Sequence, residues 1–437
     1  MRRELTQRVE SKLQDLIALT QDLIAFPTIN PPGEAYQPCA QYIGQRLSRK
    51  GFSVEYVRGE RAPGDTDKYP RINVICRYEG KGPGPCVHFN SHIDVVEVGH
   101  GWTVDPFGGE IKDGKIFGRG SCDMKGGLAA SIIAVEALIE CYPDFCGALE
   151  ISGTVDEESG GLGGVAYLAE RGYFSKPRVD HVIIPEPLHK DQICLGHRGV
   201  WWSEIETRGS IAHGSMPFLG DSAIRHMSAF LSVLEDELYP ALSKKQTQMP
   251  VIPPGARSST LNINSLHGGQ EEGHAGLPSA CVADSCRIIL DRRFLIEESL
   301  EEVKAEVVEI LEKLRKTRRN FEYELKDLLE VLPVMAEKDS AVAQAVAQGI
   351  KAVLHKDASY VVSPGTYDQK HITRLGHLQD CIAYGPGILE MAHRPDEFVG
   401  IEDLVDSAKV MALAAYSLLT EPDAMPVKRT LSDHVHS

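Results

Sequence analysis

PCVHFNSHID, residues 85–94, is a short apolar run that ends abruptly in ionisable side chains. Two later runs have the same form: ALEISGTVDEE at 148–158 and VDHVIIPEP at 179–187. Such runs, separated by helical stretches, are typical of buried strands in βαβ units and predict a mostly parallel sheet with helices on both faces. Because open α/β sheets place their sites just past the carboxyl ends of strands, the three polar ends should converge on one pocket.

The stretch from about residue 199 to 330 has a different order of elements, β-α-β-β-α-β, which is the split ferredoxin-like unit. Its segments are VWWSEIETRGS (200–210), DSAIRHMSAFLSVLEDELYPAL (221–242), TLNINSL (260–266), ACVADSCRIILDRRF (280–294), SLEEVKAEVVEILEKLRK (299–316) and FEYELKDLLEVL (321–332). The sequence therefore predicts a doubly wound α/β catalytic domain made of residues 1–198 and 331–437, with an inserted ferredoxin-like domain at 199–330. The last helix is expected at 401–421, and the tail at 422–437 should be weakly ordered.

Composition narrows the class of protein. The 437 residues carry 46 Lys and Arg against 62 Asp and Glu, a net charge of −16, which would repel the phosphate backbone of a nucleic acid. The N-terminal 26 residues have helical spacing of apolar residues rather than a signal-peptide block, and no stretch reaches transmembrane length without charges. The ten cysteines are dispersed, without a C-x-x-C pair, and should be reduced. We therefore expect a cytoplasmic protein that binds neither nucleic acid nor membrane.

Several ionisable residues stand at the ends of these runs. His92 and Asp94 lie two apart, so in an extended chain the Asp94 carboxylate could accept the imidazole N–H while the other ring nitrogen binds a metal ion. Asp123 lies between two glycine clusters in DGKIFGRGSCDMKGG (113–127). Each pattern alone is more typical of a polar turn than of a site.

The remaining candidates are Glu157 and Glu158, which follow the second run, Glu186, which ends the third between two prolines, and His393 in EMAHRPDE (390–397). Together the set offers two histidines and three carboxylates from separate core elements, a donor set that suits two divalent ions sharing one carboxylate. A spare glutamate could then deprotonate a water molecule. Spacing alone does not distinguish Glu157 from Glu158 in that role.

With these residues, the chain resembles the acetylornithine deacetylase and succinyl-diaminopimelate desuccinylase family, relatives of aminoacylases and glutamate carboxypeptidases. The resemblance covers almost the whole length, and several motifs occur in order. They are FPTINPPGE (26–34), HFNSHIDVV (88–96), WTVDPFGGEIKDGKIFGRGSCDMKGGLAA (102–130), SGTVDEESGG (152–161), PEP (185–187), GSIAHGSMP (209–217), GTYD (365–368) and AHRPDE (392–397).

The resemblance implies a role for each candidate. One ion would be held by His92, Asp123 and Glu186, and the other by Asp123, Glu158 and His393, with Asp123 bridging. Asp94 would orient His92, and Glu157 would be the general base. The inserted domain would be a lid that forms a homodimer, with His213 reaching the oxyanion in the partner subunit. Zn²⁺ is the ion expected, although Mn²⁺ and Co²⁺ accept the same ligands.

The implied reaction is hydrolysis of an amide bond in a small N-acyl amino acid or a similar compound. Two cations lower the pKa of water from 15.7 towards roughly 7, Glu157 takes its proton, and the hydroxide attacks the amide carbonyl. Glu157 then delivers the proton to the leaving amine, because an amide anion is a poor leaving group.

Two departures from the family pattern affect substrate contacts. EEGHAGLP (271–278) has His274 and Ala275 where relatives carry Asn, and GTYDQKH (365–371) replaces the G-T-S-D-G-R of desuccinylase-like members. A carboxylate-binding Arg would thereby become Lys370, exchanging a bidentate fork for a point charge. Lys370, Tyr367 and Arg292 are the candidate substrate contacts, and the specificity should differ from that of a standard desuccinylase.

Other functions fit less well. GLGGVA (161–166) matches G-x-G-x-x-A, but the carboxylates just before it would repel a pyrophosphate. No G-x-S-x-G elbow or H-E-x-x-H motif occurs. A metal-free binding protein would require a lost ligand, and all five positions are present. Dipeptide cleavage or hydrolytic removal of an amine from another small molecule stays open.

Overall fold

The computed structural model describes residues 2–251, 254–269 and 280–420. The chain forms two compact units. Among the described residues, the first contains 2–196, 336–361 and 367–420, and the second contains 197–251, 254–269, 280–335 and 362–366. The expected features at 271–278 and 422–437 lie outside the described residues, as does the last residue of the helix expected at 401–421. No helix in the described ranges is long and apolar enough to cross a membrane.

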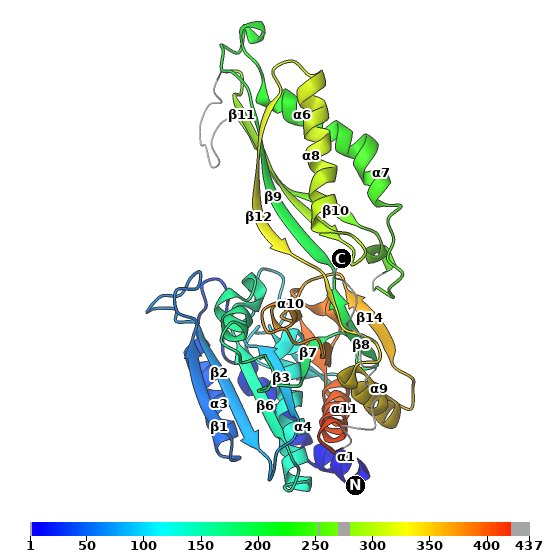
Figure 1. Cartoon of the computed structure of the whole chain (residues 1–437). Coiled ribbons are helices and arrows are strands. Elements are labelled where there is room, and N and C mark those ends of the chain that lie inside the picture. The colour runs from blue at the N-terminus through cyan, green and yellow to red at the C-terminus, as the bar shows by residue number, and fades with distance from the viewer. Residues whose placement is uncertain (1, 252–253, 270–279, 421–437) are drawn as a thin grey trace. The chain divides into compact units, whose positions relative to one another are not determined.

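The first unit is built on a large sheet in which strands run in the order β1-β2-β6-β3-β7-β15-β8 (Figure 1). Its strands are β1 (Ser53–Arg58), β2 (Ile72–Glu79), β3 (Cys86–His92), β6 (Ala148–Thr154), β7 (His181–Pro187), β8 (Gln192–His197) and β15 (Cys381–Gly385). Two short strands lie where the chain passes between units, β13 (Val334–Met335) and β14 (Ser359–Ser363).

The centre of this sheet is parallel, as the sequence predicts, and its edges are antiparallel. Strands β6, β3, β7 and β15 pair in parallel, whereas β1, β2 and β8 join through antiparallel ladders. Every residue of β3, β6 and β15 is buried, as expected for strands covered on both faces, and the buried set includes the polar residues His88, Asn90 and Glu150. His92 pairs with Thr154 at the ends of β3 and β6, so the carboxyl ends of the parallel strands lie at one edge.

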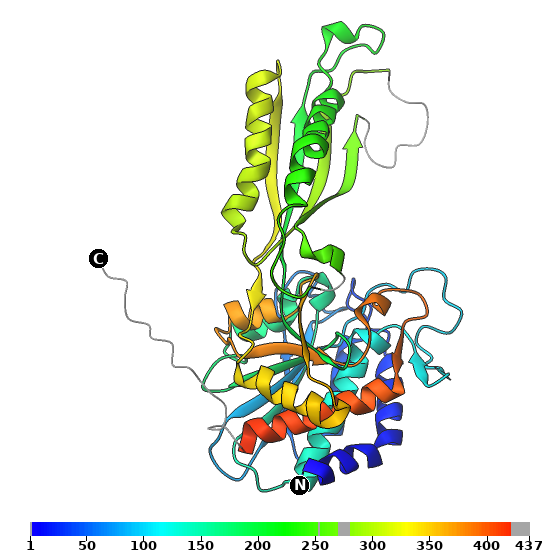
Figure 2. The same ribbon diagram turned by 90° about the vertical axis from the view of Figure 1, so that its right-hand side faces the viewer.

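Helices cover the sheet of the first unit. They are α1 (Arg2–Ser11), α2 (Leu13–Ile24), α3 (Tyr36–Ser48), α4 (Gly126–Cys141), α5 (Tyr167–Ala169), α9 (Ala341–Leu354), α10 (Gln369–Arg374) and α11 (Ile401–Thr420). Helices α9 and α11 run side by side, and α11 also packs against α4 (Figure 2). Helix α4 is buried on all sides from Gly126 to Leu138, which fits its almost wholly apolar sequence.

A small sheet joins two segments of the first unit that are distant in sequence. Its strands are β4 (Ile111–Lys112), β5 (Lys115–Phe117) and β16 (Phe398–Gly400). β16 pairs antiparallel with β5, with Phe398 opposite Phe117. This ladder brings the glycine-rich segment around Asp123 next to the segment that follows His393.

The second unit contains an antiparallel sheet of order β10-β11-β9-β12, with α6 and α8 against it (Figure 1). Its elements are β9 (Gly199–Arg208), α6 (Ala223–Val233), α7 (Tyr239–Leu242), β10 (Thr260–Gly268), β11 (Ser285–Phe294), α8 (Leu300–Thr317) and β12 (Glu322–Val331). The element order is therefore β-α-β-β-α-β, apart from the short α7. Trp201 is fully buried in the core of this unit, and the neighbouring Trp202 is only half-buried, as alternation along a strand requires.

Candidate metal centre

Two groups of side chains in the first unit could each hold a metal ion, and they share Asp123. Among the residues that the structure describes, the groups are His92, Asp123 and Glu186, and Asp123, Glu158 and His393. Within each group, one ligand atom from every residue lies within 4.8 Å of the others. The structure thus brings together all five residues that the sequence analysis placed around the ions.

Each residue comes from the end of a separate element. His92 is the last residue of β3, Glu186 is the last residue but one of β7, and Glu158 lies in η2 (Glu157–Ser159), four residues beyond β6. Asp123 lies in the turn η1 (Ser121–Lys125), which precedes α4. Parallel pairing of the strands gives the site its position, as expected for an open α/β sheet.

Asp123 uses its two carboxylate oxygens in opposite directions. His92 Nε2 lies 3.1 Å from Asp123 Oδ1, and His393 Nε2 lies 3.5 Å from Asp123 Oδ2. The outer partners are close as well, because His92 Nε2 is 3.9 Å from Glu186 Oε1 and His393 Nε2 is 3.1 Å from Glu158 Oε1. This is the arrangement that a bridging carboxylate between two ions requires.

The pKa values of these groups are shifted by burial and by one another's charges. Burial raises the pKa of Glu158 to about 7, and burial with the nearby Asp123 charge raises the pKa of Glu186 well above its ordinary value. Hydrogen bonds to Asp123 and Glu158 raise the pKa of His393 to about 10. For Asp123, burial acts upward, but hydrogen bonds from His393 and His92 outweigh it and lower the pKa.

This charge distribution fits divalent metal ions. Three buried carboxylates at one place are costly unless cations compensate them, and imidazole nitrogens with carboxylate oxygens are donors that Zn²⁺, Mn²⁺ and Co²⁺ accept. The ring of His92 also has the orientation of a metal ligand. Its Nδ1 faces the backbone carbonyl of Asp94 at 3.0 Å, which leaves Nε2 directed at Asp123 and Glu186.

Asp94, which is expected to orient His92, contacts that ring more closely through its backbone carbonyl than through its carboxylate. Its carboxylate Oδ1 lies 3.6 Å from His92 Nδ1, farther than the backbone oxygen of the same residue. Instead, the carboxylate accepts the backbone N–H groups of Glu157 at 3.2 Å and Glu158 at 3.1 Å, and the side-chain amide of Asn30 at 3.0 Å. The buried Asp94 carboxylate therefore holds the turn that carries both glutamates.

Glu157 belongs to neither metal-ligating group. Its carboxylate Oε1 accepts from Lys370 Nζ at 3.3 Å, and both side chains are almost buried, 10% exposed for Glu157 and 5% for Lys370. His371, the next residue, contacts the carbonyl of Gly160 at 2.7 Å, and burial lowers its pKa to about 4. The start of α10 therefore contacts the turn with the two glutamates, in addition to Asp94.

The other candidate substrate contacts are buried among their own neighbours. The Tyr367 hydroxyl donates to Gln369 Oε1 at 2.6 Å. The Arg292 guanidinium is fully buried in the second unit and pairs with Glu298 at 2.8 Å and Glu306 at 3.1 Å. Neither side chain is presented at the surface of its unit, so burial gives no support to a substrate contact from them.

His213 lies in the second unit, in an exposed loop. Its Nδ1 accepts from the backbone N–H of Ser215 at 3.2 Å and contacts the Ser215 hydroxyl at 2.7 Å. Because Nδ1 is an acceptor, the ring proton of the neutral imidazole is on Nε2, which can donate a hydrogen bond. Exposed apolar side chains surround it in sequence, with Ile211 64%, Phe218 78% and Leu219 67% exposed.

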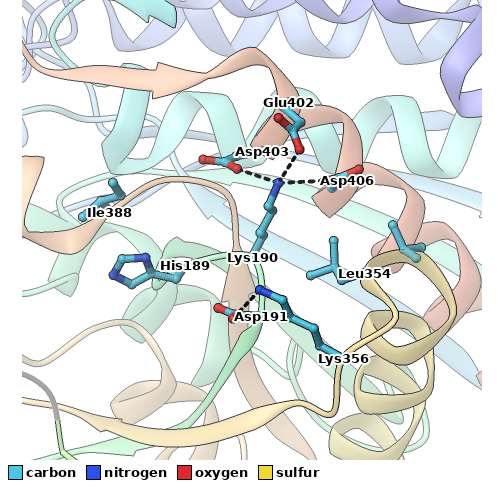
Figure 3. A pocket seen from close by; sticks show the side chains of 10 residues that line it. His189, Lys190, Asp191, Leu354, Lys356, Ile388, Glu402, Asp403 and Asp406 are labelled. Carbon is cyan, nitrogen blue, oxygen red and sulfur yellow. Dashed lines mark hydrogen bonds and ion pairs between the residues drawn. The ribbon is translucent and has the colours of Figure 1, made fainter. Parts of the chain in front are cut away.

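A separate hollow of about 490 Å³ in the first unit has a different character (Figure 3). The ammonium of Lys190 lies among Glu402 at 3.1 Å, Asp403 at 3.0 Å and Asp406 at 2.8 Å (Figure 3). These carboxylates are at the start of α11, and Lys190 follows β7 by three residues. The Lys190 ammonium already has three carboxylate partners, and these ion pairs anchor the loop after β7 to α11. This hollow is therefore not a candidate active site.

Several supporting residues lie inside quoted motifs but were not singled out from the sequence. Asn30 of FPTINPPGE contacts Asp94, and Arg119 and Glu397 form a buried pair 2.7 Å apart beside Asp123. The only indication of their importance in the sequence was that each lies within a quoted motif. The hydrogen bonds that they make connect residues far apart in the chain, which spacing does not reveal.

Comparison with known proteins gives a family match. The model of peptidase family M20/M25/M40 matches residues 88–417. Succinyl-diaminopimelate desuccinylase of Pseudomonas syringae pv. syringae is 29% identical over 399 residues, covering 90% of this chain and 96% of the relative. N-formyl-4-amino-5-aminomethyl-2-methylpyrimidine deformylase of Bacillus subtilis is 29% identical over 441 residues, covering 93% and 95%.

The fold has solved counterparts as well. The dipeptidase Dug1p of Saccharomyces cerevisiae superposes with a TM-score of 0.74 at 17% identity, covering 97% of this chain and 99% of that one. At this identity the likeness concerns the fold.

Proposed function

The chain belongs to peptidase family M20/M25/M40 and is a metal-dependent hydrolase of amide bonds, and we propose that its substrate is a small N-acyl amino acid or a similar N-acyl compound. The observation that carries the proposal is the pair of metal-ligating groups sharing Asp123, with the carboxylate of Glu157 beside them but outside both. The two relatives at 29% identity are named as a desuccinylase and a deformylase, and both names describe removal of an acyl group from nitrogen.

The ions would be held by His92, Asp123 and Glu186 on one side and by Asp123, Glu158 and His393 on the other. When bound, two divalent ions supply the Lewis acidity that makes water acidic and polarises an amide carbonyl. Zinc is the ion that we propose, since imidazole and carboxylate donors suit it, with Mn²⁺ and Co²⁺ as the alternatives.

Glu157 is the residue that moves protons. Its carboxylate accepts a proton from the attacking water and returns it to the leaving nitrogen, so that the amine departs neutral. The turn that carries it is held by hydrogen bonds to Asp94, and its carboxylate by Lys370. Lys370 therefore positions the Glu157 carboxylate. Because its ammonium is already paired, it would not serve as the binding group for a carboxylate on the substrate's acyl group.

A screen with different metals tests the proposal. Chelator-treated protein is reloaded with Zn²⁺, Mn²⁺ or Co²⁺ and assayed with N-acyl amino acids, dipeptides and aryl amides. We expect activity to return with one of these ions and kcat/KM to be highest for an N-acyl compound. A higher kcat/KM for dipeptides would favour the peptidase alternative, and the absence of any amide cleavage in every metal form would contradict the proposal.

His213 is proposed to stabilise the oxyanion of a partner subunit, in a homodimer formed through the second unit. The Nε2 proton and the exposed apolar residues of the same loop support this role. Phe218, the most exposed of these side chains, would lose apolar area to the interface if another surface covered it. The inserted domain would then act as lid and dimerisation domain, with residues 1–198 and 331–437 as catalytic domain. The cytoplasmic location stays a prediction.

Mixing two inactive variants tests this role. His213→Ala and Glu157→Ala protein are denatured together, refolded and assayed. If His213 acts across the interface, each mixed dimer has one intact site, and a random mixture recovers about a quarter of wild-type activity. The separately refolded variants are the controls. If the mixture is no more active than they are, His213 does not work in the partner subunit.

A further inference from the structure

We propose that Glu397 and Arg119 form a buried pair that positions three ligand-bearing segments, so that Glu397 sets the metal affinity of both groups without binding an ion. The inference rests on the metal centre proposed above. The two side chains are 1% and 2% exposed, and Arg119 Nη1 donates to Glu397 Oε2 at 2.7 Å. Both lie within the first unit, as do all the residues that they contact.

Glu397 builds the turn that presents Asp123. Its second oxygen, Oε1, accepts three backbone N–H groups, from Gly120 at 3.1 Å, Cys122 at 2.9 Å and Asp123 at 3.0 Å. Gly120 has a φ of 84°, in the left-handed region, which helps successive N–H groups to point towards one acceptor. Without Glu397, three buried donors would lose their partner, and the direction of the Asp123 carboxylate would no longer be fixed.

Arg119 holds the backbone of two other ligand-bearing segments. Its Nη2 donates to the carbonyl of His393 at 3.3 Å and to those of Glu97 at 3.2 Å and Val98 at 3.1 Å. Residues 97 and 98 continue the loop that leaves β3 after His92 and Asp94. The guanidinium therefore joins the His393 segment to the His92 loop, and through Glu397 to the Asp123 turn.

The β5–β16 ladder places the pair. Gly118 donates its N–H to the carbonyl of Glu397 at 2.9 Å, directly beyond the pairing of Phe117 with Phe398. The Arg119 guanidinium also lies over the indole ring of Trp102, 5.2 Å from its centroid. A pair that served only to stabilise the fold would gain little, because buried ion pairs often contribute no more than apolar residues would. The hydrogen bonds of the Arg119–Glu397 pair instead go to the backbone of segments that carry metal ligands, which favours a positioning role.

Glu136 offers a matched control in the same unit. It is 1% exposed, lies on α4, and accepts from Arg46 Nε at 2.9 Å. Glu136→Gln thus removes a buried carboxylate charge from a partly buried Arg–Glu pair that contacts none of the metal-ligating residues. Any general effect of losing such a pair on stability is shared by the two variants, whereas an effect on metal binding is expected only at Glu397.

The test measures Zn²⁺ affinity of the full-length protein by competition with a chromophoric chelator. In Glu397→Gln the amide NH₂ would face the Arg119 guanidinium or the turn N–H groups, donor against donor. We expect the Zn²⁺ affinity of both sites to fall about 10- to 100-fold, as when other residues that contact a metal ligand are lost. Because Glu157 is unchanged, kcat should recover at saturating Zn²⁺. Glu136→Gln should bind like the wild type.

A second variant covers the case in which Glu397→Gln does not fold. Arg119→Lys keeps the charge on Glu397 but loses the fork that reaches the carbonyls, and should weaken Zn²⁺ binding by a smaller factor. Wild-type affinity in both the Arg119 and Glu397 variants would overturn the positioning role and leave the metal centre intact. A wild-type protein that binds no ion would overturn the metal centre and this inference together.

Discussion

Replacing Glu157 with glutamine is expected to lower kcat at least ~10²–10⁴-fold while both metal sites stay filled. Glutamine has nearly the same shape but cannot accept a proton from water at neutral pH. The turn itself should persist, because Asp94 holds it through the backbone N–H groups of residues 157 and 158 rather than through the Glu157 side chain. Steady-state kinetics together with metal analysis of the same sample measures both effects.

A matched change at the neighbouring position serves as the control. Glu158→Gln alters a proposed metal ligand and should lose metal as well as turnover, whereas Glu157→Gln should lose turnover alone. The two residues are adjacent, so a general disturbance of the turn would affect both variants alike. Undiminished kcat in Glu157→Gln would remove that residue from the reaction.

Lys370→Met gives a further measure of the Glu157 carboxylate. If Lys370 positions Glu157, the variant should lower kcat by a similar factor for anionic and for neutral N-acyl substrates, with little change in KM. If Lys370 instead binds a substrate carboxylate, KM should rise for the anionic substrates only. The 3.3 Å contact with Glu157 and the buried ammonium lead us to expect the first result.

Asp123→Asn is expected to disturb both metal sites at once. The asparagine retains one carbonyl oxygen but presents an NH₂ group where the second oxygen faced a histidine, and NH₂ does not ligate a cation. In the wild type, Oδ1 lies 3.1 Å from His92 Nε2 and Oδ2 lies 3.5 Å from His393 Nε2. Loss of a residue that only contacts a metal ligand lowers metal affinity by ~10–100-fold. We expect the Zn²⁺ affinity of one site to fall by more than this factor, and the Zn²⁺ affinity of the other site to fall as well.

Asp113→Asn is the matched control for this prediction. It removes the same charge ten residues earlier, at the exposed turn between β4 and β5. Titration of both variants with Zn²⁺, followed by calorimetry, compares them directly. If Asp123→Asn binds two ions with wild-type affinity, Asp123 is not the bridging ligand.

Much of the architecture could be predicted from the sequence because its signals are local. The buried strands β3, β6 and β7 appear as short apolar runs, and the polar residue at each end marks the edge where the site forms. The α/β class and the amide-hydrolase activity were predicted correctly.

Contacts between distant segments could not be predicted in this way. The antiparallel edge strands, the pairing of Lys370 with Glu157 and the Arg119–Glu397 pair each join residues that spacing does not relate. The hydrogen bonds of the Asp94 carboxylate to the turn at 157–158 could not be predicted either, because H-x-D spacing suggests only a contact between His92 and Asp94. In the structure the backbone carbonyl of Asp94 takes that place, and the carboxylate is available to the turn at 157–158.

The central claim is that two metal ions share the carboxylate of Asp123. A crystal structure of the protein with Zn²⁺, with anomalous differences measured on both sides of the zinc absorption edge, tests it most directly. We predict two anomalous peaks, one among His92, Asp123 and Glu186 and the other among Asp123, Glu158 and His393. A single peak, or two peaks that do not flank Asp123, would contradict the account.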